Sequence, residues 1–150
     1  MTGPSDAGAT TAAVPKPPSR VKVTWAGGER FDAGRPGGPS VRIDGKAETG
    51  PGPVDTLVSA LASCAAIDVV EILAKRRTPV RSLTVDVVGE RVDTIPRRLR
   101  HVTLAFHIGG EGIERGHAER AIELAVNKYC SVRDSLAKDI PVVWTLTLED

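Results

Sequence analysis

The chain has 150 residues, a length that fits one ordinary domain with a continuous buried core. Its 20 basic and 19 acidic residues leave a formal net charge of +1, so charge gives no case for binding nucleic acid or an anionic membrane. Two cysteines are too few for a disulfide framework or for a zinc site built from cysteines alone.

The N-terminal segment, residues 1–19, is rich in threonine, alanine, glycine and proline, a composition typical of a disordered tail. It has no apolar block behind a basic one, as a secretory signal would have. We therefore expect a tail over 1–19, one domain over 20–150, and a cytoplasmic protein. In that compartment two cysteines are more often thiols than a structural disulfide.

Three short strands are predicted next, over residues 20–26, 30–33 and 40–44. The first alternates Val21, Val23 and Trp25 with polar neighbours, which is the pattern of a half-buried strand. Glycine-rich turns separate the three segments, so an antiparallel meander is the simplest arrangement.

A long helix is predicted over residues 54–77, which hold no glycine or proline and follow Pro53. Its apolar surface is too wide for a helix lying on a wet face, so we expect a core helix, with part of it buried against a second chain. Asp68 and Glu71 lie inside its most apolar stretch and argue against a membrane span.

The second half of the chain predicts strands and helices in turn. Alternating apolar residues indicate strands over 83–88 and 102–108, joined by a hairpin connection at 93–98. Helical spacing predicts a helix over 114–129, a short helix over 131–138 follows, and a strand over 142–148 ends the chain. Together these elements predict an α+β fold.

The two cysteines, Cys64 and Cys130, are the candidate chemical centre. Cys64 lies in the middle of the long helix among small residues, and Cys130 lies where two predicted helices meet. Each has an ordinary explanation as a buried structural cysteine, and position alone favours it. Their separation excludes a C-x-x-C motif, so the pair matters only if the fold brings the two sulfurs together.

A reactive thiol must be ionised, and a free thiol with a pKa of ~8.5 is mostly protonated near neutral pH. A nearby cation can lower that pKa. Arg42, on the strand before the long helix, is the best-placed basic residue, although spacing alone favours a solvated strand charge. Asp55 could orient this arginine through a bidentate pair, or it could be a simple helix N-terminal charge.

Other polar residues give weaker signals. His101, His107 and His117 lack metal-ligand spacing, and the glycine-rich segment 109–112 lacks the lysine of a phosphate-binding loop. We therefore expect neither a metal nor another cofactor.

Two segments resemble the OsmC/Ohr family, the osmotically induced protein C and organic hydroperoxide resistance proteins. They are PGPVDTLVSALASCAAIDVVEILAKRR and ERAIELAVNKYCSVRDSL, and the intervening LTVDVVGER and the preceding VRIDG fit as well. The resemblance covers about residues 20–150. In the hydroperoxide-resistance branch a glutamate follows the proline directly, whereas Val54 follows Pro53 here. The Lys-Tyr-Cys-Ser-Val run points to the OsmC-like branch.

The resemblance implies an intertwined homodimer, with antiparallel sheets wrapped around long central helices. It implies that Cys64 is the peroxidatic thiol, that Cys130 resolves it, and that Arg42 and Asp55 occupy the positions of the activating arginine and carboxylate. The implied activity is reduction of organic hydroperoxides, with an external dithiol as reductant. The alternative is a non-catalytic dimeric module that binds a ligand or senses redox stress.

Overall fold

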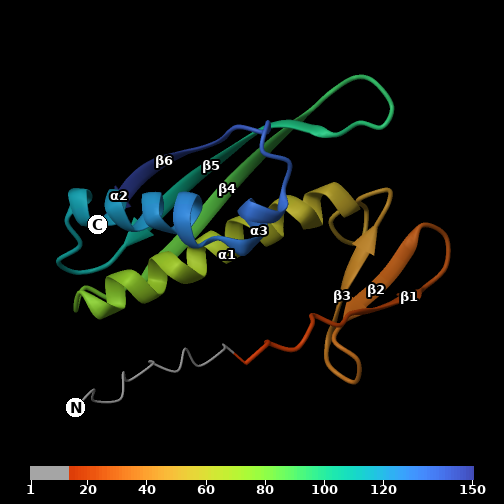
Figure 1. Cartoon of the computed structure of the whole chain (residues 1–150), viewed down its shortest axis with the longest axis horizontal. Helices are drawn as coiled ribbons and strands as arrows, with labels where there is room; N and C mark the ends of the chain where they lie inside the picture. Colours follow the sequence, from red (N-terminus) through yellow and green to blue (C-terminus); the bar gives the residue numbers. More distant parts are fainter. Residues whose placement is uncertain (1–13) are drawn as a thin grey trace, which may run out of the picture.

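The computed structural model describes residues 14–150, and it has the predicted α+β architecture (Figure 1). Its elements in chain order are β1 (Lys22–Trp25), β2 (Arg30–Gly34), β3 (Ser40–Asp44), α1 (Pro53–Lys75), β4 (Ser82–Arg91), β5 (Leu99–Gly109), α2 (Arg115–Leu124), a π-helical turn η1 (Ala125–Tyr129), α3 (Ser131–Ser135) and β6 (Val142–Glu149). Residues 14–19 form neither helix nor strand. The rest of the predicted tail, 1–13, lies outside the described residues.

Strands β1, β2 and β3 form the predicted antiparallel meander, which lies beyond the N-terminal end of α1 (Figure 1). The register aligns apolar side chains across the three strands, so that one face is apolar from edge to edge. The residues of this face, called here the apolar sheet face, are Val23, Trp25, Phe31, Ala33, Val41 and Ile43. Four of them, Val23, Trp25, Phe31 and Val41, are exposed within the chain.

The second sheet has the order β4-β5-β6. Strands β4 and β5 form the predicted antiparallel hairpin, whereas β6 runs parallel to β5. A parallel partner needs a crossover connection, and α2, η1 and α3 supply it. Helix α1 and the helices of this crossover lie over one face of the sheet (Figure 1).

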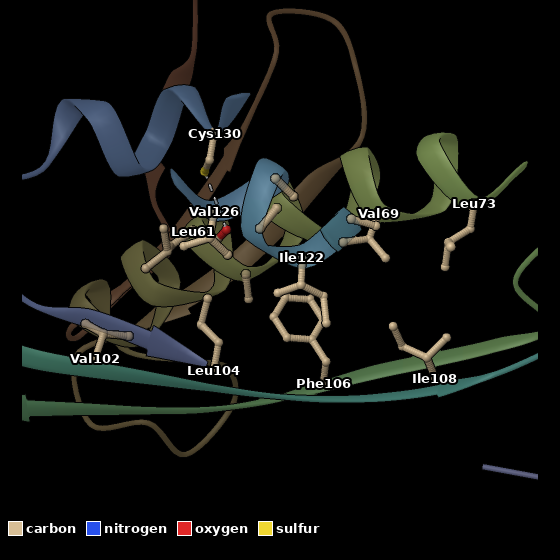
Figure 2. Close-up of a cluster of buried hydrophobic side chains, with 14 of the residues drawn as sticks. Leu61, Val69, Leu73, Val102, Leu104, Phe106, Ile108, Ile122, Val126 and Cys130 are labelled. Carbon is tan, nitrogen blue, oxygen red and sulfur yellow. Dashed lines mark hydrogen bonds between the residues drawn. The ribbon is translucent and has the colours of Figure 1, made fainter. Parts of the chain in front are cut away.

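The core lies between that sheet face and the helices. Figure 2 shows Leu104, Phe106 and Ile108 of β5 pointing toward the helices, where they meet side chains of α1 and α2. All three are fully buried. Burial of each such side chain contributes about 1.5–3 kcal/mol to folding, so this layer fixes α1 on the sheet.

Helix α1 buries only one of its apolar stripes within the chain. The buried stripe is Leu61, Ala65, Val69 and Leu73, spaced four residues apart, and it faces the sheet and α2. Ile67 and Val70 belong to a second apolar stripe that is exposed, and Leu57, which continues the buried row toward the start of the helix, is exposed as well. Helix α1 therefore has more apolar surface than the single chain buries, as the sequence predicted.

Among residues 14–150, α1 is the one helix long and apolar enough to cross a membrane by length and composition. Core helices of globular proteins meet the same criteria. Only 28% of the most apolar stretch of α1 is fully buried in the chain.

The helices after β5 differ from the prediction. The predicted single helix over 114–129 is α-helical only to Leu124 and continues as a π-helical turn. The predicted third helix ends at Ser135 instead of Lys138, because Leu136 has extended backbone angles.

Candidate functional site

The loop between β3 and α1 is organised by one buried carboxylate. Asp44 is 1% exposed, and its oxygens accept hydrogen bonds from the backbone N–H groups of Lys46 and Thr49 and from the Thr49 hydroxyl. These donors, with the Arg30 guanidinium 3.6 Å away, hold the pKa of Asp44 far below its ordinary value. Asp44 thus fixes the chain that leads into α1, a role that sequence analysis missed; the Asp-Gly-x-x-x-Thr run was the available signal.

Helix α1 begins at Pro53, where the missing N–H of proline costs nothing. Asp55 lies in the first turn, and its Oδ2 accepts a hydrogen bond from the Gly52 N–H at 2.9 Å. Asp55 therefore satisfies a free backbone donor at the helix start. It lies nine residues before Cys64, about 14 Å along the helix axis at ~1.5 Å per residue. Within one chain Asp55 acts on the helix terminus and not on the thiol.

Cys64 lies in the middle of α1 and is half-buried. Its position is next to the buried stripe of the helix, and its side chain packs against the edge of the core. On the exposed side of the same helix lies a shallow depression, mostly apolar, and Cys64 is next in sequence to one of its lining residues. The lining residues are Ser63, Ala66, Ile67, Val70 and Glu71. A thiol at this point borders both the interior of the chain and an apolar open surface.

Cys130 reaches the same region because of η1. The π-helical turn closes with a hydrogen bond from the Cys130 N–H to the Ala125 carbonyl at 2.9 Å, five residues back. Cys130 then has extended backbone angles, so the chain turns and α3 starts at the next residue. Its Sγ accepts a hydrogen bond from the Arg133 N–H at 3.3 Å, as an N-cap side chain does.

The Cys130 thiol is buried against α1. It is 3% exposed and donates to the Leu61 carbonyl oxygen at 3.9 Å, the dashed contact in Figure 2. Burial raises the pKa of the Cys130 thiol, the Arg133 N–H lowers it in part, and the neighbouring Cys64 thiol raises it again by hydrogen bonding and charge. Cys64 therefore lies near enough to influence the ionisation of Cys130, and Cys130 is protonated at neutral pH.

Arg42 is committed to a different partner in the chain. Its Nε and Nη2 donate to the two carboxylate oxygens of Asp32, at 2.7 and 3.2 Å. Asp32 lies directly opposite Arg42 on the neighbouring strand, and the pair raises the pKa of Arg42 and lowers that of Asp32. The suggested bidentate pair between Arg42 and Asp55 is not formed among residues 14–150. The role of Arg42 at the thiol stays a prediction.

The three histidines each lie beside a carboxylate. His101 is 3.3 Å from Glu90, His107 is 3.2 Å from Asp86, and His117 is close to a glutamate on its own helix. Within residues 14–150, no group of three or more histidine, cysteine, aspartate or glutamate side chains is arranged to hold a metal ion.

This arrangement can support thiol–disulfide chemistry. Cys64 is partly accessible and lies among small residues of α1, and Cys130 is buried at the same core cluster. Oxidation of the accessible sulfur would place an electrophile next to the buried thiol, and a disulfide could then form between α1 and the start of α3.

Comparison with known proteins decides the family. The model of the OsmC-like protein family matches residues 44–145, which include both cysteines and Asp55. The chain belongs to the OsmC-like family. Its relatives include protein YhfA of Escherichia coli K12, which is 32% identical over 124 residues, covering 82% of this chain and 92% of YhfA.

Solved structures of OsmC-like proteins have the same fold. An OsmC-like protein from Mycoplasma pneumoniae is similar with a TM-score of 0.74 at 16% identity, covering 87% of this chain and 96% of that one. The organic hydroperoxide resistance protein OhrB of Bacillus subtilis is similar with a TM-score of 0.58 at 14% identity, covering 86% and 98%. At these identities the likeness concerns the fold, which confirms the expected OsmC-like architecture.

Proposed function

We propose that this protein is a thiol-dependent peroxidase that reduces organic hydroperoxides. The observation that carries the proposal is that two unequal thiols, Cys64 half-buried and Cys130 buried, pack at the same core cluster between α1 and the start of α3. Membership of a family whose fold is shared by hydroperoxide resistance proteins supports it. The apolar depression beside Cys64 suits the organic group of an alkyl hydroperoxide better than it suits hydrogen peroxide.

In the proposed cycle the Cys64 thiolate attacks the terminal peroxide oxygen. The O–O bond breaks, an alkoxide leaves and takes a proton to become the alcohol, and Cys64 becomes a sulfenic acid. The Cys130 sulfur then attacks the Cys64 sulfur and releases water as the disulfide forms. An external dithiol supplies the two electrons that restore both thiols.

Arg42 is the cation that we assign to the Cys64 thiolate and to the charge that develops on the departing oxygen. Its guanidinium is held by Asp32 within one chain, so the assignment requires that Arg42 keep this carboxylate as a support while it reaches the site. Asp55 contributes by fixing the start of α1.

We also propose that the working form is a homodimer. Two apolar surfaces lie uncovered in the single chain: the exposed stripe of α1 with Ile67 and Val70, and the apolar sheet face with Trp25. Monomeric proteins rarely expose contiguous apolar surface of this kind. A second copy would cover both. A cytoplasmic location accords with this chemistry, because the reducing cytosol returns both cysteines to the thiol form.

The test is oxidation of the reduced protein with one equivalent of cumene hydroperoxide, followed by thiol titration. We expect the loss of two thiols per chain, a faster reaction than with hydrogen peroxide in stopped-flow measurements, and no turnover in Cys64→Ser. Thiols that stay intact would favour the alternative of a non-catalytic dimeric module. Full turnover by Cys64→Ser would overturn the mechanism.

A further inference from the structure

A small polar pocket opens beside Cys130. It has a volume of about 180 Å³ and is formed by the π-helical turn and α3. Cys130 itself lines it, and so do Lys128, Arg133 and Lys138, with Asp134 as the one carboxylate. The proposed peroxidase cycle gives this pocket no role.

The charges of the pocket are not balanced within the chain. Lys138 is paired with Asp134, but neither Lys128 nor Arg133 forms an ion pair among residues 14–150. Lys128 lies 5.4 Å from the centre of the neighbouring Tyr129 ring, which leaves its charge available. The lining therefore holds three cations and one carboxylate, an excess of two positive charges.

The Arg133 guanidinium also has an unused donor. Its Nη2 donates to the Ile140 carbonyl oxygen at 2.9 Å, which fixes the plane of the group. Its Nη1 is buried and has no hydrogen-bond partner in the part of the chain that the structure describes. A buried N–H of a charged group without an acceptor is unfavourable, so the guanidinium is suited to an added anion.

The size of the pocket selects the ligand. Sites for drug-sized molecules usually span about 300–1,000 Å³, so about 180 Å³ admits a carboxylate on a short chain and excludes a protein loop. Cys130 is one of the lining residues, so a ligand in the pocket lies beside the residue that a reductant must reach.

We propose that this pocket binds the carboxylate of a small anionic thiol, and that this thiol reduces the Cys64–Cys130 disulfide by attack on the Cys130 sulfur. The inference rests on the proposed function, since it requires the disulfide. The incoming thiolate forms a bond to Cys130 Sγ, the S–S bond breaks, and Cys64 leaves with the electron pair and takes a proton. A second thiol, from the same molecule or another, then attacks the mixed disulfide and releases Cys130.

The direction of attack agrees with the environment of the two sulfurs. Thiol–disulfide exchange is faster when the departing thiol has the lower pKa, and burial raises the pKa of Cys130. Departure of Cys130 is therefore disfavoured, and attack from the pocket makes Cys64 the leaving group.

The experiment starts from protein oxidised with diamide, so that disulfide formation does not depend on peroxidase activity. Its reduction is followed with mercaptopropionate, mercaptoethanol and cysteamine, which are anionic, neutral and cationic, and each rate is normalised to thiolate concentration. At low salt we expect the normalised rate of reduction by mercaptopropionate to exceed that by cysteamine by at least about tenfold. The mercaptopropionate rate should saturate with its concentration, and propionate should inhibit it. Equal normalised rates would overturn the inference.

The test variant is Lys128→Gln with Lys138→Gln, which removes charge from the pocket and leaves the Arg133 support of the backbone in place. In this variant the ratio of the mercaptopropionate rate to the cysteamine rate should fall to about twofold or less. The control is Lys75→Gln with Arg76→Gln, at the far end of α1, and it should keep the wild-type preference. A preference that survives in the pocket variant would also contradict the inference. If cumene hydroperoxide leaves the thiols intact while the diamide disulfide still shows the charge preference, the proposed peroxidase activity fails and the pocket assignment stands.

Discussion

The Cys130 thiol donates to the backbone carbonyl of Leu61, 3.9 Å away and one helical turn before Cys64. This contact joins the end of the π-helical turn to the middle of α1 and sets the buried sulfur beside the accessible one. The reactivity of the pair therefore depends on how these two segments pack.

Replacing Cys130 with serine should separate the two steps of the cycle. A serine Oγ can still accept the Arg133 N–H, and serine is favoured at this N-cap position, so we expect the free energy of unfolding to change by less than about 1 kcal/mol. The Cys64 sulfenic acid should then persist and be trapped by dimedone, as measured by mass spectrometry. Cys130→Val, which cannot accept that hydrogen bond, should trap equally well but lose about 1–2 kcal/mol of stability. Rapid full turnover in Cys130→Ser would exclude its resolving role.

Asp44→Asn should lower the free energy of unfolding at neutral pH and make that free energy less dependent on pH in the acid range. The pKa of Asp44 is lowered in the folded state, chiefly by the Thr49 hydroxyl and the backbone N–H groups, from an ordinary value of 3.8. Its contribution is therefore present above about pH 4 and is lost as the pH falls below that value. Urea titrations at pH 7 and pH 3 measure both effects. The exposed Asp93→Asn is the control, and identical pH profiles for the Asp44 variant and wild type would contradict the assignment.

Arg42→Met should slow the oxidation of Cys64 by cumene hydroperoxide by about 10²-fold, if the guanidinium stabilises the thiolate and the departing oxygen. The effect on stability should be small, because the Arg42–Asp32 pair is partly exposed. Stopped-flow oxidation measures the rate. Asp32→Asn removes the partner but keeps the cation, so it should retain much of the rate. Equal rates in Arg42→Met and wild type would assign Arg42 to the sheet alone.

A glutamate on the apolar sheet face should weaken self-association. Val23→Glu places a charge among side chains that a second copy would bury, and we expect the dissociation constant to rise by about 100-fold or more. Sedimentation velocity across a concentration series measures this. Thr24→Glu, one residue further along and on the opposite face of the same strand, is the matched control. A monomeric wild-type protein would overturn the dimer proposal directly.

Two glycine substitutions should change the stability of the protein in opposite directions. A Cβ at Gly50 would overlap the Arg42 carbonyl oxygen, so Gly50→Ala should destabilise the protein by about 1–3 kcal/mol. A Cβ at Gly116, in the first turn of α2, meets nothing within 4 Å, so Gly116→Ala should stabilise by up to about 1 kcal/mol. Thermal unfolding of the two variants checks both. A stabilising Gly50→Ala would show that the β3–α1 loop is less tightly packed than the structure indicates.

Local pattern predicted the elements of this fold well. Strand alternation placed β3 and β6 within a residue, and the absence of breakers placed α1 within two residues. The parallel pairing of β6 with β5 could not be predicted from the sequence, because the alternating pattern of a strand does not specify its partner or direction. The exposed stripe of α1 was anticipated only as excess apolar surface, since periodicity does not say which stripe faces the sheet.

The candidate site was predictable only in part. Both cysteines were named from their surroundings and from the family resemblance, but their contact depends on tertiary packing. The suggestion that Asp55 pairs with Arg42 came from proximity in sequence, whereas cross-strand register gives Arg42 to Asp32. The pocket at Arg133 had no sequence signal, because its three cations converge only when the π-helical turn and α3 fold against each other.

The π-helical turn amounts to one residue added to an otherwise α-helical segment. Each helical residue rotates the chain by about 100°, so loss of that residue would turn Cys130 away from α1. A deletion of one residue in this turn would therefore uncouple the two thiols while both cysteines remain in the chain.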